Sequence, residues 1–252
     1  MVLFCLTILH FNFTIMPPEQ YNQPQEKKDP IWLVPLSIII CGALIGGGIY
    51  FSSKNPKGEI KNSLLGAASA QLNPVTSEDH IFGNPNASVF VVEFGDTECP
   101  YCKNFHQTMK RVMSEYGENG SVAWVYRHAP LHKRAPKESE ATECVAELGG
   151  NDKFWKYLDL IYTTTSGNDT LNPTELPKLA VSVGIDEKKF NDCLSSGKYS
   201  VQVLSGIEEI SRAGGRGTPF SIIITRSGEK APVEGAQPYE VVKAIIEAAL
   251  KQ

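Results

Sequence analysis

A strand that runs straight into two closely spaced cysteines constrains this fold more than any other stretch of the chain. Residues 88–94 read SVFVVEF, a β-branched and aromatic run typical of a buried strand. The sequence CPYC follows at residues 99–102, and apolar residues then recur at helical spacing until Gly117. Residues 121–129 predict a second strand. We therefore expect a β-α-β unit with both cysteines in the first turn of its helix.

The rest of the chain divides into a helical block and a β-β-α end. Apolar stripes typical of helices packed on one another recur over about residues 133–212. Residues 219–225 then predict a strand, residues 231–235 a short partner strand, and residues 239–250 a closing helix. This order predicts an α/β fold that carries a helical insertion.

The position of the two cysteines makes them chemically unequal. Cys99 lies where a strand ends and a helix begins, and Pro100 suits the first helical position. Backbone N–H groups and the positive end of the helix dipole therefore stabilise a thiolate at Cys99, the reactive form of this side chain. Cys102, one turn later, is expected to lie deeper and to resolve the mixed disulfide that Cys99 forms. Glu98 adds a like charge, which opposes thiolate formation.

Two other functional classes find little support in the composition. The formal net charge is −4 and there is no basic stripe, which argues against nucleic acid as a partner. Structural zinc needs four ligands, usually from two close pairs, and the chain contains a single CxxC. A zinc-binding or interaction module is therefore the weak non-enzymatic alternative, and we expect neither a metal nor a cofactor.

Residues 31–51 form a run of 21 residues without a charge, close to the length that a helix needs to cross a bilayer. Most buried helices of soluble proteins are shorter and contain charges. A cleaved signal peptide is another alternative. The run is too long for its apolar core, and the nearest small-residue site, residues 68–70, lies too far downstream. We therefore expect an uncleaved transmembrane anchor.

The anchor divides the chain into parts with different expected roles. Residues 1–30 are expected to be a cytoplasmic tail, of which residues 1–15 are untranslated if Met16 is the true start. Residues 52–78, rich in Lys, Asn, Ser, Ala and Gly, predict a tether, and residues 79–252 the folded domain. Lysines on both sides of the anchor leave its orientation open under the positive-inside rule.

Three motifs together resemble the DsbA-like branch of the thioredoxin superfamily. CPYC begins the first helix, GTPF at residues 217–220 leads a later strand, and VEGAQPYEVVKAI covers residues 233–245. The last motif looks like the C-terminal part of Gram-positive and membrane-anchored members. The resemblance spans about residues 78–250. It implies a thioredoxin fold with an inserted helical domain, preceded here by one N-terminal transmembrane helix.

The resemblance also implies roles for individual residues. Cys99 matches the nucleophile, Cys102 the resolving cysteine, and Pro219 the cis-proline that faces the disulfide. Thr218 matches the residue that pairs its main chain with an extended substrate peptide. Glu93 matches a buried acid that helps protons leave and reach Cys102. Its apolar neighbours favour burial over the alternative of an exposed strand carboxylate.

The remaining polar and aromatic candidates near the cysteines have weaker assignments. Pro100 and Tyr101 form the variable dipeptide, which the resemblance implies tunes thiolate stability and contacts the substrate. A proton relay through a histidine is conceivable. For His106, His128 and His132 alike, however, a half-buried structural histidine is the favoured interpretation.

The function that the resemblance implies is an extracytoplasmic thiol:disulfide oxidoreductase, a protein disulfide oxidase that introduces disulfides into secreted proteins. Its implied partners are reduced secreted or surface proteins, as substrates, and a DsbB-like or VKOR-like membrane reoxidant. Because the cytosol is reducing, we expect a single-pass protein of the cell membrane with its catalytic domain outside, and a monomer. A disulfide isomerase or reductase remains the enzymatic alternative, although the stretch from Phe51 to about Glu78 is too short for the N-terminal dimerisation domain that dedicated isomerases usually carry.

Cys144 and Cys193 lie on the apolar faces of two expected helices. As free thiols they would be ordinary buried residues. In an oxidising compartment they would form a structural disulfide that closes a loop of about 50 residues, worth roughly 4 kcal/mol in the chain-entropy model. The bridge requires Cα atoms within about 7 Å, so the sequence alone leaves both alternatives open.

Overall fold

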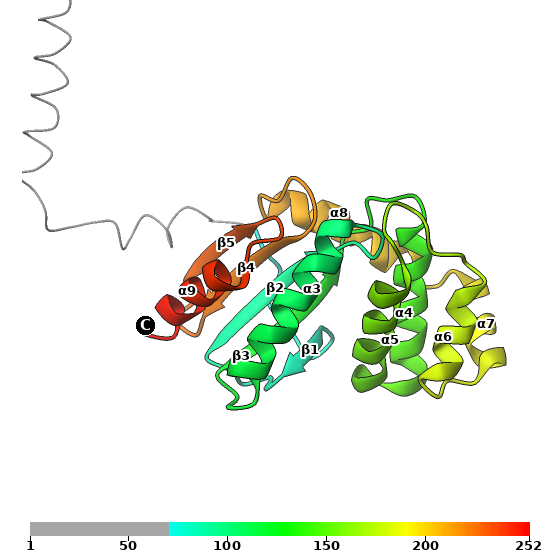
Figure 1. The fold of residues 1–252 in the computed structure, drawn as a ribbon, viewed down its shortest axis with the longest axis horizontal. Helices are drawn as coiled ribbons and strands as arrows, with labels where there is room; N and C mark the ends of the chain where they lie inside the picture. The colour runs from blue at the N-terminus through cyan, green and yellow to red at the C-terminus, as the bar shows by residue number, and fades with distance from the viewer. Residues whose placement is uncertain (1–70) are drawn as a thin grey trace, which may run out of the picture. The chain divides into compact units, whose positions relative to one another are not determined.

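The computed structural model describes residues 71–252, which form a five-stranded sheet with helices against both of its faces (Figure 1). The strand order is β1-β3-β2-β4-β5. β2 and β3 are parallel, and the other neighbouring pairs are antiparallel. The strands are β1 (His80–Gly83), β2 (Val89–Gly95), β3 (Val122–His128), β4 (Phe220–Thr225) and β5 (Lys230–Glu234).

The helices fall into those that cover the sheet and those that form a separate group beside it. α3 (Pro100–Val112) and α9 (Tyr239–Ala249) lie on one face, and α3 continues into a π-helical turn, η1 (Met113–Gly117). The helices between β3 and β4 are α4 (Ala135–Gly149), α5 (Asn151–Thr164), α6 (Glu175–Ser182), α7 (Glu187–Ser196) and α8 (Ser200–Arg212). They correspond to the helical insertion that the sequence predicts. α8 packs on the other face of the sheet, and α4 to α7 form the group beside it (Figure 1).

Strand β2 is buried on both faces, which explains its nearly continuous apolar sequence. Val89 and Val91 belong to the core shared with α3 and α9. Val92 and Phe94 belong to a second core on the opposite face, where Ile210 of α8 contacts them. The first turn of α3, with the cysteines, thus begins at the end of the most buried strand.

The chain is held against the sheet from Asn73 onwards, within the segment that the sequence assigns to the tether. The Arg127 guanidinium, at the end of β3, donates hydrogen bonds to the carbonyl oxygens of Asn73 and Pro74, each at 3.0 Å. It also pairs with Asp79 at 2.8 Å and with Glu209 of α8 at 2.5 Å. One half-buried cation therefore fastens the start of the domain to both the sheet and a helix.

Strand β1 is not predicted by the sequence pattern. Its four residues, HIFG, form the edge of the sheet and pair antiparallel with β3. A run this short has no detectable alternation, so its strand conformation depends on the partner that it pairs with.

The predicted tail at residues 1–30, the predicted anchor at residues 31–51 and most of the predicted tether lie outside the described residues. Within residues 71–252, no helix is both long enough and apolar enough to cross a membrane.

Helix α8 crosses very close to the end of β3. A methyl group built on Gly206 would lie 1.8 Å from the carbonyl oxygen of His128, well inside the van der Waals limit. Only glycine therefore allows the helix and the strand to approach this closely.

Candidate active site at the first turn of α3

The two cysteines of CPYC lie at the junction of β2 and α3, and both are free thiols. Cys99 has an extended backbone and occupies the N-cap of α3, with Pro100 in the first helical position. The Cys99 carbonyl accepts the hydrogen bond from Lys103 N at 3.1 Å that opens the helix. The Cys99 side chain is 5% exposed and Cys102 is completely buried. Cys99 is thus the thiol that can meet a partner protein.

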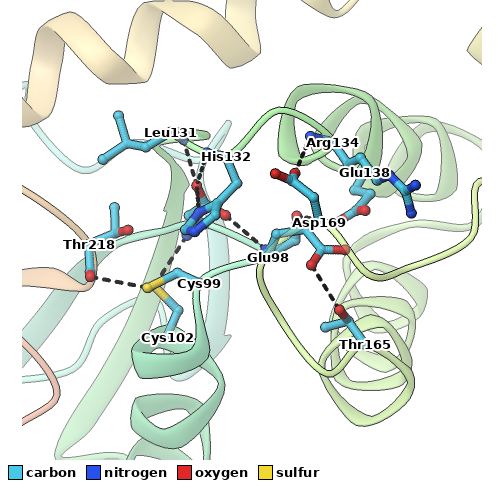
Figure 2. Close-up of polar contacts among 12 residues, drawn as sticks. Glu98, Cys99, Cys102, Leu131, His132, Arg134, Glu138, Thr165, Asp169 and Thr218 are labelled. Atoms are coloured by element: carbon cyan, nitrogen blue, oxygen red, sulfur yellow. Dashed lines mark hydrogen bonds and ion pairs between the residues drawn. The ribbon is translucent and has the colours of Figure 1, made fainter.

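The surroundings of Cys99 favour its thiolate and lower its pKa to about 6. The largest cause is the hydrogen bond with the Cys102 side chain, and burial opposes it. The backbone N–H groups of Cys102 and Tyr101 also stabilise the negative charge. As a thiol, Cys99 donates to the Thr218 carbonyl oxygen over 3.3 Å (Figure 2). A pKa near 6 leaves Cys99 mostly ionised at neutral pH.

Cys102 behaves in the opposite way. Burial raises its pKa well above the usual value, and the neighbouring Cys99 and Glu93 add to the effect. The Asp96 N–H, at 3.4 Å from its sulfur, opposes this shift. The reduced pair therefore consists of a thiolate near the surface and a protonated thiol beneath it.

Glu93 is a completely buried carboxyl group on β2. Trp124 Nε1 donates to its Oε2 at 2.8 Å, and Oε1 has no partner within the described part of the chain. Burial raises the pKa of Glu93 to about 8, the Trp124 hydrogen bond opposes this shift, and the charge of Cys99 adds to it. The structure thus provides a protonated acid that interacts electrostatically with both cysteines.

The wall opposite the thiols comes from the residues just before β4. The Thr218–Pro219 peptide bond is cis, and the Pro219 carbonyl accepts a hydrogen bond from Gly235 N at 3.0 Å. Because β4 pairs with β2, Phe220 lies opposite Phe94 and the Thr218 carbonyl reaches Cys99. The fold therefore brings Pro219 and Thr218 to the thiol pair, as the resemblance implies.

The variable dipeptide has one exposed and one packed member. Tyr101 is 66% exposed and presents a large apolar surface beside the thiols. Pro100 lies against Gly167 of the α5–α6 loop, where an added methyl group would lie 2.8 Å from the Pro100 ring. Tyr101 can therefore meet a partner, while Pro100 links the active-site turn to the helical block.

Asp96 and His132 form a hydrogen-bonded pair that the sequence analysis does not predict. The Asp96 side chain is completely buried, and its Oδ2 accepts from His132 Nδ1 at 3.0 Å. Figure 2 shows the His132 ring near Cys99, and the charge of Cys99 acts on it. A detectable signal existed: both residues follow parallel neighbouring strands, whose carboxyl ends meet at one edge of the sheet.

Glu98 turns away from Cys99, contrary to the expectation that its charge opposes the thiolate. Its carboxylate accepts a hydrogen bond from Thr165 Oγ1 at 3.0 Å (Figure 2). It also accepts from Thr170 N at 3.1 Å and from Leu171 N at 2.9 Å. Its carbonyl accepts from Asn168 N at 2.7 Å. Glu98 therefore fastens the α5–α6 loop to the active-site turn.

Glu138 of α4 is a second buried acid near this turn. Thr97 Oγ1 donates to its Oε2 at 2.6 Å. Burial raises the pKa of Glu138 to about 8; the Thr97 hydrogen bond opposes the shift, and the nearby carboxylates of Glu98 and Asp96 increase it. Glu138 is thus a protonated link between the turn and the helical block.

The other two histidines make structural contacts, in line with the favoured interpretation. His106 is 2% exposed, and its Nε2 lies 3.2 Å from Asp159 Oδ1. His128 is buried, and its Nε2 lies 3.0 Å from Glu143 Oε1. His128 and His132 stand four residues apart, a spacing found in zinc sites, but they contact different carboxylates. In residues 71–252, no group of three or more His, Cys, Asp or Glu side chains could hold a metal ion.

A disulfide between Cys144 of α4 and Cys193 of α7 is present, with a Cα–Cα distance of 5.9 Å. It joins two helices that share the apolar core of the helical block. These cysteines are therefore structural and separate from the CPYC pair.

The chain was compared with known protein families and with curated proteins. A family model described as Thioredoxin matches residues 75–248. The Na(+)/H(+) antiporter NhaA 3 of Salinispora tropica is 31% identical over 164 residues, which cover 62% of this chain and 24% of that protein. The antiporter NhaA of Herminiimonas arsenicoxydans is 28% identical over 176 residues, or 69% of this chain and 26% of that protein. The chain spans about a quarter of the length of these relatives.

Solved structures match the fold over nearly their whole length. BdbD from Bacillus subtilis, in its oxidised form, superposes with a TM-score of 0.62 at 23% identity, covering 72% of this chain and 97% of that one. Alpha-DsbA1 of Wolbachia pipientis gives 0.62 at 18% identity, with 72% and 94% covered. The thiol-disulfide exchange protein alpha-DsbA2 of the same organism gives 0.57 at 23% identity, with 66% and 84% covered. The predicted thioredoxin-like fold is therefore confirmed.

Proposed function

Because this chain belongs to the thioredoxin family, we propose that it exchanges disulfides with other proteins through Cys99 and Cys102. One observation carries the proposal: the two thiols lie one helical turn apart with their pKa values shifted in opposite directions. This asymmetry lets one cysteine form a mixed disulfide and the other resolve it. The similarity to structures of thiol-disulfide exchange proteins supports the same reaction class.

The exchange begins with the oxidised pair. A substrate thiolate attacks Cys99 Sγ, the Cys99–Cys102 bond breaks, and its electrons leave on Cys102 as a thiolate. Glu93 supplies a proton to this buried thiolate, because its own pKa of about 8 keeps it protonated at neutral pH. A second substrate thiolate then attacks the substrate sulfur of the mixed disulfide, and Cys99 leaves as a thiolate. The substrate loses two electrons, and the cysteine pair gains them.

We propose that the protein acts as an oxidase, which donates its disulfide. A stabilised Cys99 thiolate favours the reduced form of the pair, and a stable reduced form makes the disulfide a stronger oxidant. A disulfide isomerase or reductase is the alternative that the same geometry allows. The fate of scrambled and of reduced ribonuclease separates the two, since an oxidase acts on the reduced form and an isomerase rescues the scrambled one.

We propose further that the domain works outside the cytoplasm, tethered to the cell membrane by residues 31–51. The Cys144–Cys193 disulfide supports this placement, because stable disulfides belong to oxidising compartments. Its substrates would be reduced secreted or surface proteins, and a DsbB-like or VKOR-like membrane protein would reoxidise it. Labelling of intact cells with a membrane-impermeant thiol reagent tests the placement: a reduced Cys99 that stays unlabelled until the cells are opened contradicts it.

Trapping of substrates tests the central proposal. Cys102→Ser should accumulate mixed disulfides with other proteins, because the resolving thiol is absent. Cys99→Ser is the matched control and should trap none, since the attacking sulfur is gone. If neither variant traps a partner, the proposed exchange loses its basis.

A further inference from the structure

The buried carboxylate of Asp96 accepts most of its hydrogen bonds from two neighbouring residues, Leu131 and His132. Its Oδ2 accepts from Leu131 N at 2.5 Å, from His132 N at 2.8 Å and from His132 Nδ1 at 3.0 Å. Its Oδ1 accepts from Glu98 N at 2.8 Å. A completely buried carboxylate needs a positive partner, and the imidazole of His132 is the ionisable donor in this set.

These contacts fix the orientation of the His132 ring. Since an ionised carboxylate only accepts hydrogen bonds, Nδ1 carries a proton and donates it to Asp96. Nε2 makes no hydrogen bond within the part of the chain that the structure describes, and the side chain is 28% exposed. Figure 2 shows the His132 ring near Cys99, whose charge acts on it. Because Nδ1 is bonded to Asp96, Nε2 is the ring nitrogen left able to exchange a proton.

The main-chain atoms of Asp96 bind the same two cysteines. Asp96 N donates to Cys102 Sγ at 3.4 Å, and Asp96 O accepts from Cys99 N at 3.1 Å. Tyr162 OH donates to the same carbonyl at 3.3 Å. One residue thus holds the imidazole with its side chain and the thiol turn with its backbone.

The charges that face His132 are mostly negative. Burial lowers its pKa, but the hydrogen bond and charge of Asp96, the charge of Cys99 and the charge of Asp169 outweigh burial and raise it. Glu98 and Glu138, the other acids of this region, interact with the α5–α6 loop and with Thr97. The attraction between two opposite charges is mutual. A Cys99 thiolate that stabilises the His132 imidazolium is therefore stabilised by that imidazolium in turn.

We propose that His132, held in place by Asp96, supplies the positive charge that stabilises the Cys99 thiolate during disulfide exchange. This inference rests on the exchange reaction proposed above and adds a residue from outside the CPYC motif. Asp96 is a positioning residue, because it acts through the ring that it orients.

His132, oriented by Asp96, contributes to two steps of the exchange reaction. When the second substrate thiolate attacks the mixed disulfide, the electrons of the breaking bond pass to Cys99 Sγ, where the imidazolium neutralises the developing charge. In the neutral form, His132 Nε2 can accept the proton of that second substrate thiol before the attack. The proton then resides on His132, whose charge is needed in the following step.

The first experiment needs no substitution in the active site. The histidine resonances of the purified full-length chain are titrated by NMR in the oxidised and the reduced state, and His132→Gln identifies the His132 signal. The pKa of His132 should be higher in the reduced protein, because only that state carries the Cys99 thiolate. Equal values in the two states would overturn the proposal.

The second experiment measures the Cys99 thiolate directly, from its absorbance near 240 nm as a function of pH. His132→Gln should raise the pKa of Cys99 by about one unit, a tenfold smaller acid constant, since an opposite charge at close range shifts a pKa by about 1–3 units. Asp96→Asn should shift it in the same direction. Lys133→Gln, which removes a charge from the exposed neighbouring residue, is the matched control and should leave it unchanged.

The outcomes separate this inference from the function on which it rests. If Cys102→Ser traps substrates but His132→Gln leaves the Cys99 titration unchanged, the exchange stands and the role of His132 is wrong. An equal shift in Lys133→Gln would also overturn it, because the effect would then be one of net charge. If no variant traps substrates while His132 responds to the redox state, the ion pair stands and the exchange proposal fails.

Discussion

Trp124 Nε1 donates a 2.8 Å hydrogen bond to Glu93 Oε2, while Glu93 Oε1 has no partner among residues 71–252. A single neutral donor cannot compensate for removing a carboxylate from water. The carboxyl group therefore keeps its proton up to a pH of about 8 and can release it when a stronger base forms beside it. The Cys102 thiolate, which is generated in the same buried space, is such a base.

Glu93→Gln should stabilise the domain at neutral pH while impairing exchange. The folded-state pKa is raised from 4.5 to about 8, so the folded protein holds a proton that the unfolded chain has lost. Stability therefore falls as the pH rises from about 4.5 to about 8, and the substitution removes this loss. The gain at pH 7 is on the order of 3 kcal/mol. Urea unfolding of the reduced protein between pH 5 and 8 measures it.

The same variant should slow disulfide exchange by about a hundredfold near pH 7, the lower end of the range for loss of a general acid. Glu118→Gln, at an exposed position, is the matched control and should change neither the stability nor the rate. A Glu93→Gln protein with unchanged stability and an unchanged pH profile would contradict the assigned protonation state.

Removal of Glu98 should loosen the α5–α6 loop. Glu98→Ala leaves the N–H groups of Thr170 and Leu171 without their acceptor, which costs about 2–4 kcal/mol of folding free energy. The loop should also become sensitive to protease, which mass spectrometry of the fragments locates. Glu118→Ala serves as the control, and cleavage outside residues 165–171 would argue against the contact.

The Cys144–Cys193 disulfide should stabilise the helical block. It spans 49 residues of sequence, for which the chain-entropy model gives about 4 kcal/mol. Denaturant unfolding compares two proteins that both carry Cys99→Ser and Cys102→Ser. One keeps the Cys144–Cys193 disulfide, and the other carries Cys144→Ala and Cys193→Ala. A loss below about 1 kcal/mol would place the disulfide outside the range that the model gives for such a loop.

Gly206→Ala should destabilise the domain by about 1–3 kcal/mol, the usual cost of forcing atoms into a packed site. The added methyl group would overlap the His128 carbonyl oxygen and push α8 away from β3. Ser205→Ala, one residue earlier on the exposed side of the same helix, should have little effect. Thermal unfolding of both variants decides the matter; equal melting temperatures would rule out the close approach.

Features determined by local sequence could be predicted well. The apolar run before CPYC, the helical periodicity after it and the apolar neighbours of Glu93 sufficed for β2, for α3 and for the burial of the acid. Strand β1 could not be recognised, because its four residues depend on pairing with β3.

Two features that depend on distant segments were not predicted. Asp96 and His132 are 36 residues apart, and they meet only because β2 and β3 are parallel and end at the same edge. The sequence predicts that the charge of Glu98 opposes the thiolate of Cys99, because the two residues are adjacent in the chain. Its direction is set by a loop about 70 residues away.

The partner of Cys99 lies far along the chain, and this has a consequence for biosynthesis. The Thr218 carbonyl that contacts Cys99 is 119 residues downstream, beyond the whole helical block, and it is positioned by the pairing of β4 with β2. A growing chain therefore contains the Cys99 thiol for 119 residues of synthesis before the opposite wall exists. A nascent CPYC segment can form adventitious disulfides during that interval, whereas the completed domain presents Cys99 in a single defined setting. Translation order thus separates the synthesis of the two thiols from that of the residues that complete their surroundings.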